Sequence, residues 1–486
     1  MTNVSVVPAN KEAIATSSFT EDQKQAYTEL MEFINKPYNA NDYKRALSGA
    51  AGTGKTYLVR ALIKNCNYSH SLIGLAAPTH KAARVLTESI ALPNIKANTV
   101  ASDLGLRPNY ESAAFDIENP PFDPRGKIKV GMYRIYIVDE SSMLSYSMYG
   151  LLEKKCKQHN VKLITIGDAS QLPPVNESYS PAFKSVKTYT LKQIVRQDDD
   201  NPVRKLLDLL RYDIDHKTFK FMDYIVKNRS QFDNAYTKGY QVCSFNDFKN
   251  QISKYFSDPH LTKDVDYCKV IGYTNDCVSG WNKFIRESTI QDAEKSIITK
   301  HDLIISYTTI VDIFNSPVII NSEDYIIKDI VNYTHPDYNL KGFLVKFYQI
   351  FGGKITQPLF VLDHRDMETM KNYVFISNKM IETAKTCSSK FKAQKWKEYF
   401  TFKDSCLLLI DIKNASGIKL YNRTADYGFA LTAHKSQGST FDTAFVDVQD
   451  IVFNKYGQIR PNAEEINRRL YVACSRCKSK LFLRVG

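Results

Sequence analysis

The 486-residue sequence contains no apolar run that approaches the roughly 18 residues needed to cross a bilayer. Its first 18 residues, MTNVSVVPANKEAIATSS, lack the basic start and the continuous apolar stretch of a secretory signal. Internal repeats and low-complexity segments are also missing. We therefore expect a globular cytoplasmic protein with a flexible N-terminus and no contact with membranes.

Cysteine is too irregular in number and placement to suggest a disulfide framework. The nine cysteines are an odd number, and most lie in apolar strand or helix patterns, which favours reduced, packed thiols. Cys474 and Cys477 form the only CxxC, with no second pair or His pair at the spacing of a zinc site. A structural metal centre is therefore disfavoured.

Acidic residues are outnumbered by basic ones. Lys and Arg total 65 against 52 Asp and Glu, which gives a formal net charge of +13. Such an excess favours a polyanionic partner through phosphate neutralisation and counterion release. A basic surface that only keeps the protein soluble is the alternative, so charge alone leaves nucleic-acid binding open.

The chain is longer than the roughly 250 to 300 residues at which single cores stop growing, so we expect several domains. Short apolar runs alternate with helical patterns, which is typical of parallel sheets covered on both faces. These runs occupy residues 72–77, 133–138, 161–167, 269–275, 443–448 and 479–485. We predict an α/β protein with one sheet in the first ~190 residues and a second divided between 196–300 and 413–486.

Three stretches depart from that rhythm. Residues 104–126 are rich in turn residues and predict a hairpin-like insertion. Residues 301–377 alternate short β-branched and aromatic segments with Asn, Ser, Asp and Gly, which predicts a small antiparallel barrel. Residues 378–404 predict a basic helix that carries Phe391 and Trp396 among lysines.

The segment GAAGTGKTYL, residues 49–58, matches the phosphate-loop pattern G-x-x-x-x-G-K-T between a short strand and an amphipathic helix. Such a loop turns its backbone N–H groups towards phosphate oxygens, while the helix N-terminus adds partial positive charge. We expect Lys55 to reach the β and γ phosphates of ATP and Thr56 to ligate Mg²⁺. The loop residues expected to hold the nucleotide are Gly49, Gly52, Thr53, Gly54, Lys55 and Thr56.

Acidic and amide residues follow the next apolar strands. Asp139 and Glu140 end the run YRIYIV, where Asp139 is suited to bind Mg²⁺ and Glu140 to act as the general base. Solvated strand caps are the alternative, which the phosphate loop upstream makes less favoured. Asp168 and Gln171 follow a third strand and should lie at the same sheet edge, beside the γ-phosphate.

The segments VDESSM and GDASQLPPV resemble motifs of superfamily 1 helicases, and specifically of the RecD-like 5′-to-3′ branch, superfamily 1B, with its Dda-like phage replication helicases. FTEDQKQA, APTHKAARVL, KVIGYTNDCVSGWN, ALTAHKSQGSTFD and LYVACSRCK are similar to further motifs in the family's order, over about 300 residues. The resemblance implies two RecA-like P-loop motor domains, a β-hairpin pin and an SH3-like barrel. After a flexible N-terminus at 1–18, the resemblance implies a first motor domain at 19–195, which contains the pin at about 96–130. The second motor domain comprises 196–300 and 413–486, and residues 301–412 form an inserted domain with the barrel and the basic helix.

The resemblance also implies roles for single residues. Gln23 would read adenine, although Thr20 and Gln23 also form a T-x-x-Q capping box, and Gln437 and Gly438 would contact ATP. Arg196 and Arg476 would stabilise charge on the transferred phosphoryl group, which makes hydrolysis sensitive to domain closure; ion pairs are the alternative. The residues implied to contact single-stranded DNA are Pro78, Thr79, His80, Thr99, Thr432, His434 and Lys435.

Two departures from the family pattern are mild. Thr440 stands where many relatives carry Glu, which puts a sugar-hydroxyl contact there in doubt, whereas Ala473 and Ser475 leave the neighbouring Arg476 in place. Phe115 lies in the segment similar to the pin, where it would stack on the last base pair, or instead pack on its own hairpin or the barrel. Phe115→Ala should then reduce unwinding but spare DNA-stimulated ATPase activity; equal loss of both would refute the wedge.

The sequence thus predicts an ATP- and Mg²⁺-dependent DNA helicase that moves 5′ to 3′ on single-stranded DNA, in phage replication or recombination and in the host cytoplasm if phage-encoded. Expected partners are single-stranded and forked duplex DNA, with a single-strand binding protein or other replication proteins as further candidates for a monomeric enzyme. Two alternatives stay open: a translocase that displaces proteins with little unwinding, and a non-motor P-loop protein.

Overall fold

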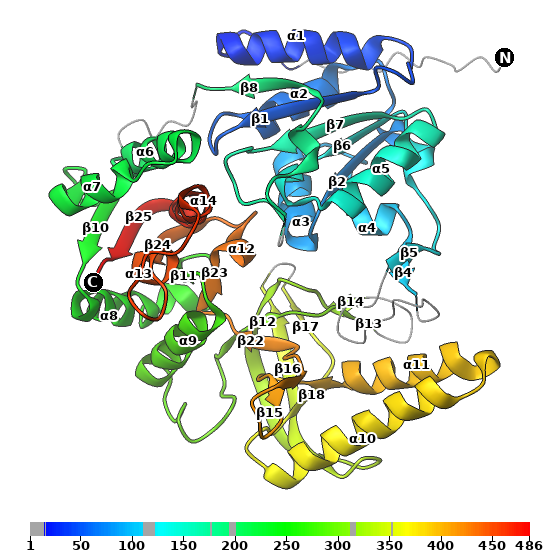
Figure 1. Ribbon diagram of the computed structural model, residues 1–486, viewed down its shortest axis with the longest axis vertical. Helices are drawn as coiled ribbons and strands as arrows, with labels where there is room; N and C mark the ends of the chain where they lie inside the picture. Colours follow the sequence, from blue (N-terminus) through cyan, green and yellow to red (C-terminus); the bar gives the residue numbers. More distant parts are fainter. Residues whose placement is uncertain are drawn as a thin grey trace.

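The computed structural model describes residues 14, 16–109, 122–174, 177–193, 201–311, 317–350 and 353–486. These residues form two α/β units, each built on a largely parallel six-stranded sheet, and an inserted unit with a mainly antiparallel sheet (Figure 1). We call them the first unit, the second unit and the inserted unit. The α/β class predicted from the apolar runs is confirmed.

The first unit has the strand order β3-β2-β6-β7-β1-β8, and every neighbouring pair runs parallel. Its strands are β1 (Lys44–Gly49), β2 (Ile73–Ala77), β3 (Asn98–Thr99), β6 (Ile135–Val138), β7 (Lys162–Gly167) and β8 (Lys187–Leu191). Its helices are α1 (Glu21–Asn35), α2 (Lys55–Asn65), α3 (His80–Ile90), α4 (Val100–Asp103) and α5 (Tyr146–Gln158).

Alternate residues of β6 show how both faces of this sheet are buried. Ile135 and Ile137 pack in the core formed with α1, α2 and α3, whereas Tyr136 and Val138 pack in the core formed with α4 and α5. This explains why the strand is an unbroken apolar run in the sequence. The carboxyl ends of the parallel strands consequently meet at one edge of the sheet.

The second unit has the strand order β23-β11-β24-β25-β10-β9, with β9 antiparallel to β10 and the other pairs parallel. Its strands are β9 (Ser230–Phe232), β10 (Gly239–Cys243), β11 (Cys268–Gly272), β23 (Ala430–Thr432), β24 (Phe441–Asp447) and β25 (Cys477–Arg484). Its helices are α6 (Val203–His216), α7 (Lys220–Lys227), α8 (Phe245–Phe256), α9 (Asn275–Thr289), α12 (Ala433–Ser436), α13 (Val448–Val452) and α14 (Ala463–Cys474). Helices α6 and α14 pack on one face, and α8 and α9 on the other.

The inserted unit carries a seven-stranded sheet in the order β19-β18-β16-β15-β12-β22, with β17 paired to β16. These strands are β12 (Leu303–Ser306), β15 (Asp324–His335), β16 (Leu340–Gln349), β17 (Lys354–Ile355), β18 (Leu359–Leu362), β19 (Cys406–Leu407) and β22 (Ala425–Tyr427). Two short hairpins accompany it, β13 (Ile310–Val311) with β14 (Pro317–Ile319) and β20 (Ile412–Lys413) with β21 (Lys419–Tyr421). The antiparallel character predicted for this region is confirmed, while the closed SH3-like barrel stays a prediction.

The single basic helix predicted over 378–404 is wrong. Two helices occupy this part of the chain, α10 (Met367–Thr386) and α11 (Ser389–Ser405), and they lie side by side at the edge of the inserted unit (Figure 1). The helix breaks at Cys387 and Ser388, which both have extended backbone angles. Trp396 is buried between the two helices, whereas Phe391 is exposed.

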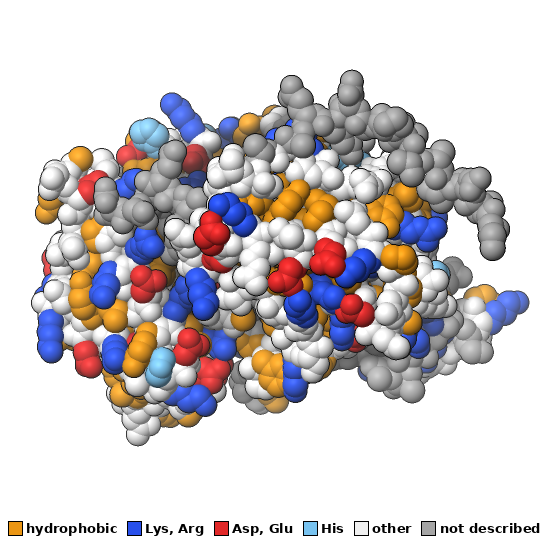
Figure 2. Space-filling model, turned by 90° about the horizontal axis from the view of Figure 1, so that it is seen from above, with side chains coloured by type: hydrophobic (Ala, Val, Ile, Leu, Met, Phe, Trp, Pro, Cys, Tyr) orange, Lys and Arg blue, Asp and Glu red, His pale blue; other side chains and the backbone are white. Residues whose placement is uncertain are grey.

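The predicted insertion at 104–126 begins and ends as a two-stranded antiparallel ladder, β4 (Leu106–Pro108) with β5 (Phe122–Pro124). Phe115 lies outside the described residues, so its role as a wedge stays a prediction. Along the described chain, the helices are all too short or too polar to span a membrane. On the face shown in Figure 2, Lys and Arg are interspersed with Asp and Glu, so the basic excess does not gather there.

Candidate active site

The phosphate loop joins β1 to α2 at the carboxyl edge of the first sheet. Gly52 and Gly54 have φ of 84° and 77°, a left-handed backbone that favours glycine. A Cβ on Gly49 would lie 2.6 Å from Thr53 Oγ1, and one on Gly54 would lie 2.5 Å from the Gln23 amide nitrogen. Lys55 Nζ donates hydrogen bonds to the carbonyl oxygens of Gly49 (2.7 Å) and Ala50 (2.9 Å). The loop is thus a tight backbone cradle with an ammonium group at its centre.

Gln23 ties the first helix to this loop. Its Oε1 accepts from Thr20 N (3.0 Å), which completes the capping box, and its Nε2 donates to Thr53 O (2.8 Å). The capping role derived from the T-x-x-Q spacing is therefore present, and the adenine contact stays a prediction. Asp22, the preceding residue, accepts from the backbone N–H groups of Lys192 and Gln193 just beyond β8.

Asp139 and Glu140 follow β6 at the same sheet edge. Glu140 has a left-handed backbone (φ 50°), and its N–H donates to Asp139 Oδ1 at 2.8 Å. Burial raises the pKa of Asp139, and the nearby Lys55 opposes this rise. Burial and the neighbouring Asp139 raise the pKa of Glu140, while Arg476 and Lys55 lower it. The two carboxyl groups therefore share one electrostatic environment with the phosphate-loop lysine, while their roles in Mg²⁺ binding and base catalysis stay predictions.

Arg476 reaches this environment from the second unit. Its buried guanidinium donates to Val472 O (2.9 Å), Ser439 O (3.1 Å) and Ser475 Oγ (2.9 Å). Burial lowers the pKa of Arg476, and Glu140 across the interface is the largest influence that raises it. The guanidinium is thus held rigidly within electrostatic range of Glu140. Arg196, the other predicted arginine, lies outside the described residues.

Direct hydrogen bonds join the two α/β units beside this site. Tyr471 Oη on α14 donates to Asp168 Oδ2 at 2.7 Å, and Asp168 is only 2% exposed. Arg468 Nη1 donates to the carbonyl oxygens of Ala169 (2.6 Å) and Gln171 (3.0 Å). Gln437 Nε2 donates to Leu172 O at 3.1 Å. Side chains of the second unit therefore hold the segment 168–172 of the first unit through hydrogen bonds.

Sequence reasoning missed Tyr471 and Arg468 in this contact. Tyr471 lies in the segment LYVACSRCK and Arg468 just before it. Their hydrogen-bond partners belong to the first unit, and only the packing of the two units against each other brings them together. Gln171, which was predicted, lies at the contact with a buried Oε1 that has no hydrogen-bond partner among the described residues. Such an orphaned acceptor needs a ligand or a water molecule.

The predicted strand-contacting residues gather at the carboxyl edges of the two sheets. Thr79, Thr99 and Thr432 each cap a helix, because their hydroxyl oxygens accept from Ala82 N, Ser102 N and Lys435 N respectively. Pro78 and His80 flank Thr79 where β2 ends and α3 begins. The threonine hydroxyls thus have structural partners, and their contact with DNA stays a prediction.

His434 and Lys435 follow Thr432 on α12. His434 borders a cavity of about 440 Å³ between the units, together with Leu172 and Arg469. The Lys435 ammonium lies 3.0 Å from the centroid of the Tyr307 ring, and desolvation lowers the pKa of this lysine to about 7. Gly438, predicted to contact ATP, would bring an added Cβ within 3.6 Å of Ala82 Cβ on α3. The segment 432–438 therefore lies against the first unit.

The residues present fit a nucleotide with a divalent cation. Gly49 and Gly54 in the cradle leave no room for a side chain, and the Gln171 acceptor at the contact between the two units lacks a partner among the described residues. Thr56 in the first turn of α2 and Asp139 at the end of β6 supply the hard oxygen donors that Mg²⁺ prefers. Lys55, Thr56 and Asp139 are the side chains that would hold the pair.

Comparison with known proteins gives five resemblances, three to sequences and two to solved structures. A family profile described as an AAA domain matches residues 19–224. An uncharacterised protein of Acanthamoeba polyphaga mimivirus is 24% identical, over 95% of this chain and 99% of that protein. The ATP-dependent RecD2 DNA helicase of Deinococcus radiodurans is 31% identical over 160 residues, which span 32% of this chain and 20% of the helicase.

Among solved structures, the Pif1 helicase of Candida albicans is 17% identical, with a TM-score of 0.47 over 96% of this chain and 94% of that one. The Bacteroides Pif1 helicase in complex with ADP-AlF3 and single-stranded DNA is 15% identical, with a TM-score of 0.47 over 96% and 92%.

Proposed function

We propose that this protein is an ATP-dependent DNA helicase of superfamily 1, and within it of the RecD-like branch 1B, that moves 5′ to 3′ on single-stranded DNA and unwinds duplex. The observation that carries the proposal is the composite site, in which the Arg476 guanidinium of the second unit lies within electrostatic range of Glu140 in the first. The match of residues 19–224 to an AAA domain and the partial similarity to RecD2 support it.

In this proposal residues 19–195 form one motor domain and residues 196–300 with 413–486 the other. Bound ATP with Mg²⁺ supplies the phosphoryl group and its charge neutralisation. Lys55 holds the phosphates, Glu140 accepts the proton of the attacking water, and the Gln171 side chain orients that water. Arg476, together with Arg196, stabilises the charge that develops during transfer.

Hydrolysis is coupled to movement because the same contact closes the site and joins the units. Arg476 is effective only while the second unit lies against Glu140, and Tyr471, Arg468 and Gln437 hold it there. Opening after hydrolysis shifts the second unit's segment 432–438 relative to α3, and these two elements carry the proposed strand contacts. Alternation between the two states converts phosphoryl transfer into steps along the strand.

The deciding experiment compares duplexes that carry either a 5′ or a 3′ single-stranded tail, with and without ATP. We expect unwinding only of the 5′-tailed substrate and only with ATP; unwinding of the 3′-tailed substrate alone would contradict the polarity. Lys55→Ala should abolish hydrolysis yet retain DNA binding, and continued turnover would refute the role of the phosphate loop. ATPase activity that DNA does not alter would instead indicate a non-motor P-loop protein.

A single-turnover assay on a forked duplex separates the helicase from a translocase that only displaces bound proteins. The helicase releases the strand within one binding event, whereas the translocase removes a roadblock protein from single-stranded DNA without strand release. We place the helicase in phage DNA replication or recombination, as a monomer acting on forked DNA beside a single-strand binding protein.

A further inference from the structure

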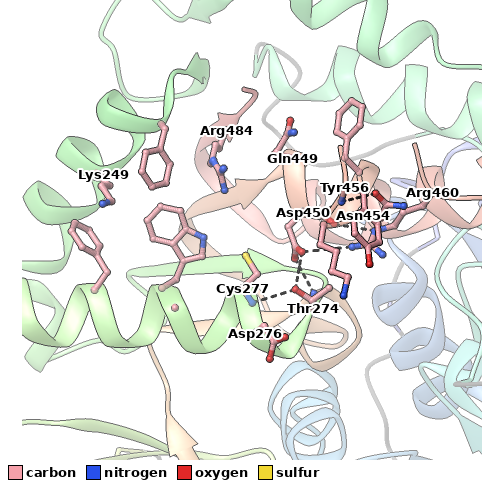
Figure 3. Close-up of a pocket in the computed structure, with 16 residues that line it drawn as sticks. Lys249, Thr274, Asp276, Cys277, Gln449, Asp450, Asn454, Tyr456, Arg460 and Arg484 are labelled. Carbon is pink, nitrogen blue, oxygen red and sulfur yellow. Dashed lines mark hydrogen bonds and ion pairs between the residues drawn. The ribbon is translucent and has the colours of Figure 1, made fainter. Parts of the chain in front are cut away.

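A cavity of about 760 Å³ opens in the second unit, apart from the nucleotide site (Figure 3). It lies at the carboxyl edge of the sheet, because its walls include Thr274 just after β11, Asp450 just after β24 and Arg484 at the end of β25. In open α/β sheets this is the edge at which ligands bind. Its volume is in the range of ligand sites, which run from about 300 to about 1,000 Å³.

Aromatic rings and cations line the cavity together. Phe245, Trp281 and Phe284 form one wall. The Lys249 ammonium lies 4.6 Å from the Phe245 ring centroid and 4.8 Å from that of Phe284, and the Arg484 guanidinium lies 4.8 Å from Phe245. Single-stranded nucleic acid is bound by this combination, in which rings stack on bases and cations neutralise phosphates.

The indole of Trp281 is fixed in the wall. Its Nε1 donates to Asp447 Oδ2 at 2.8 Å, and Arg484 Nη1 donates to the same oxygen at 2.6 Å. Arg484 Nε is buried and has no hydrogen-bond partner among the described residues. In Figure 3 the guanidinium of Arg484 points into the space between the aromatic wall and the loop that carries Asn454 and Tyr456. The wall is therefore preorganised and retains one unused donor.

A path of stacked side chains joins the cavity to the proposed strand contacts. The Arg460 guanidinium, which lines the cavity, lies 4.7 Å from the Tyr273 ring centroid, and that of Arg469 lies 3.7 Å from the same ring. Tyr273 and Arg469 in turn border the interdomain cavity that contains His434. Burial lowers the pKa of His434, and the charge of Arg469 in the same cavity lowers it further. Two guanidinium groups on one ring thus connect His434 to the aromatic cavity.

We propose that this cavity is a second strand-binding site, which holds nucleotides at one end of the bound DNA strand after the strand leaves His434. The inference rests on the proposed function and extends its DNA contact beyond the segment 432–438. Bases stack against the wall formed by Phe245 and Phe284, and the phosphates meet Lys455 and Arg460 at the rim. An acidic peptide rich in aromatic residues is the competing occupant, and the test below distinguishes it.

The test measures the affinity for oligothymidylates of about 8 and about 16 nucleotides, since only the longer one spans both sites at the usual size of a strand-binding groove. Phe284→Ala and Lys455→Gln should each weaken binding of the longer strand, Phe284→Ala by about tenfold, and leave that of the shorter strand nearly unchanged. Lys455→Gln should also reduce the slope of log affinity against log salt concentration by about one, which is the contribution of one phosphate contact. Tyr236→Ala, an exposed aromatic elsewhere, and Lys154→Gln are the matched controls.

A photo-crosslinking residue at Tyr456, which is 75% exposed at the rim, adds a readout that does not depend on the stability of the variants. It should label one end of the longer strand and not the other. Unchanged affinities in both pocket variants, or equal labelling of both ends, would overturn the inference while DNA-stimulated ATPase activity in the wild type still supports the helicase. Binding of a synthetic Asp- and Phe-rich peptide that Phe284→Ala abolishes, with DNA binding intact, would assign the cavity to a protein partner.

Discussion

Replacing Tyr471 by phenylalanine removes one hydroxyl group from the contact between the two α/β units and keeps the packing of the ring. The hydroxyl donates to the buried carboxylate of Asp168 at 2.7 Å, and Ser170 N donates to the other oxygen at 3.0 Å. A hydrogen bond to a charged group contributes about 1.5 to 3 kcal/mol. Because Asp168 retains one donor and regains water when the units separate, we take the lower value, about 1.5 kcal/mol against the closed arrangement.

That loss corresponds to a factor of about ten in the equilibrium between closed and open arrangements. In the proposed mechanism Arg476 acts only when the units are closed, so DNA-stimulated ATPase activity at low ATP should fall by about tenfold. The assay is steady-state ATP hydrolysis at saturating single-stranded DNA, with thermal unfolding measured in parallel. We expect the melting temperature to change little, because the hydrogen bond lies between units rather than within a core.

Tyr136→Phe is the matched control. Its hydroxyl also donates to a buried aspartate, Asp103 Oδ2 at 3.0 Å, but both residues belong to the first unit. This variant should lower the melting temperature and leave the ATP dependence of hydrolysis unchanged. If Tyr136→Phe and Tyr471→Phe lowered activity equally, or if Tyr471→Phe hydrolysed ATP like the wild type, the coupling assigned to the Asp168 contact would be refuted.

The remaining predictions concern charge. Burial and Asp139 raise the pKa of Glu140 above its ordinary 4.5, so the rate of hydrolysis should decline as the pH falls through a value above 4.5. Glu140→Gln should bind ATP without turnover. A hydrolysis rate that does not fall at acidic pH would contradict the role of Glu140 as general base. Desolvation lowers the pKa of Lys435 to about 7, so DNA affinity should weaken as the pH rises through neutrality, and Lys435→Arg should remove that dependence if the lysine contacts the strand. Arg84→Ala leaves the buried Glu323 carboxylate with the Gln349 amide, which donates to it at 2.9 Å, and should cost about 3 kcal/mol in the contact between the first and inserted units; an unchanged thermal transition would show that this pair does not stabilise the contact.

Strands β2, β6, β7, β11 and β24 could be predicted from the sequence because they are apolar runs buried on both faces, whereas the edge strands β8 and β9 are partly exposed and were not predicted. The runs at 133–138 and 161–167 became β6 and β7, within two residues of their predicted bounds. The motif residues around Gly49, Asp139 and Gln171 could be predicted to share a sheet edge, since carboxyl ends of parallel strands meet there. Periodicity contains no information on strand order, and so the partners of Tyr471 and Arg468 in the first unit could not be derived.

The inserted unit was harder to predict for a different physical reason. Helix α10 packs Met370, Tyr373 and Val374 on sheet residues such as Phe360, and it packs on α11 with Trp396 and Ala384 buried between the two helices. These apolar positions of α10 begin before the predicted bounds of 378–404, and the lysines around Trp396 indicated a single exposed basic helix instead. The basic composition of this stretch gave no indication of the break at Cys387 and Ser388.

Helix α3 connects the first unit to the inserted unit and, through a shared carboxylate, to the second unit. It begins at Thr79 and His80, the proposed strand contacts, and one turn later Arg84 pairs with Glu323 of the inserted unit. Between them Lys81 is 8% exposed and lies 3.6 Å from Asp324, which also accepts from the fully buried Lys269 of β11 at 3.0 Å. The Asp324 carboxylate thus joins a lysine of each α/β unit, and separating either unit would leave a buried charge without its partner. Because this carboxylate is shared by both α/β units, we expect any opening at the nucleotide site to rearrange this junction as well.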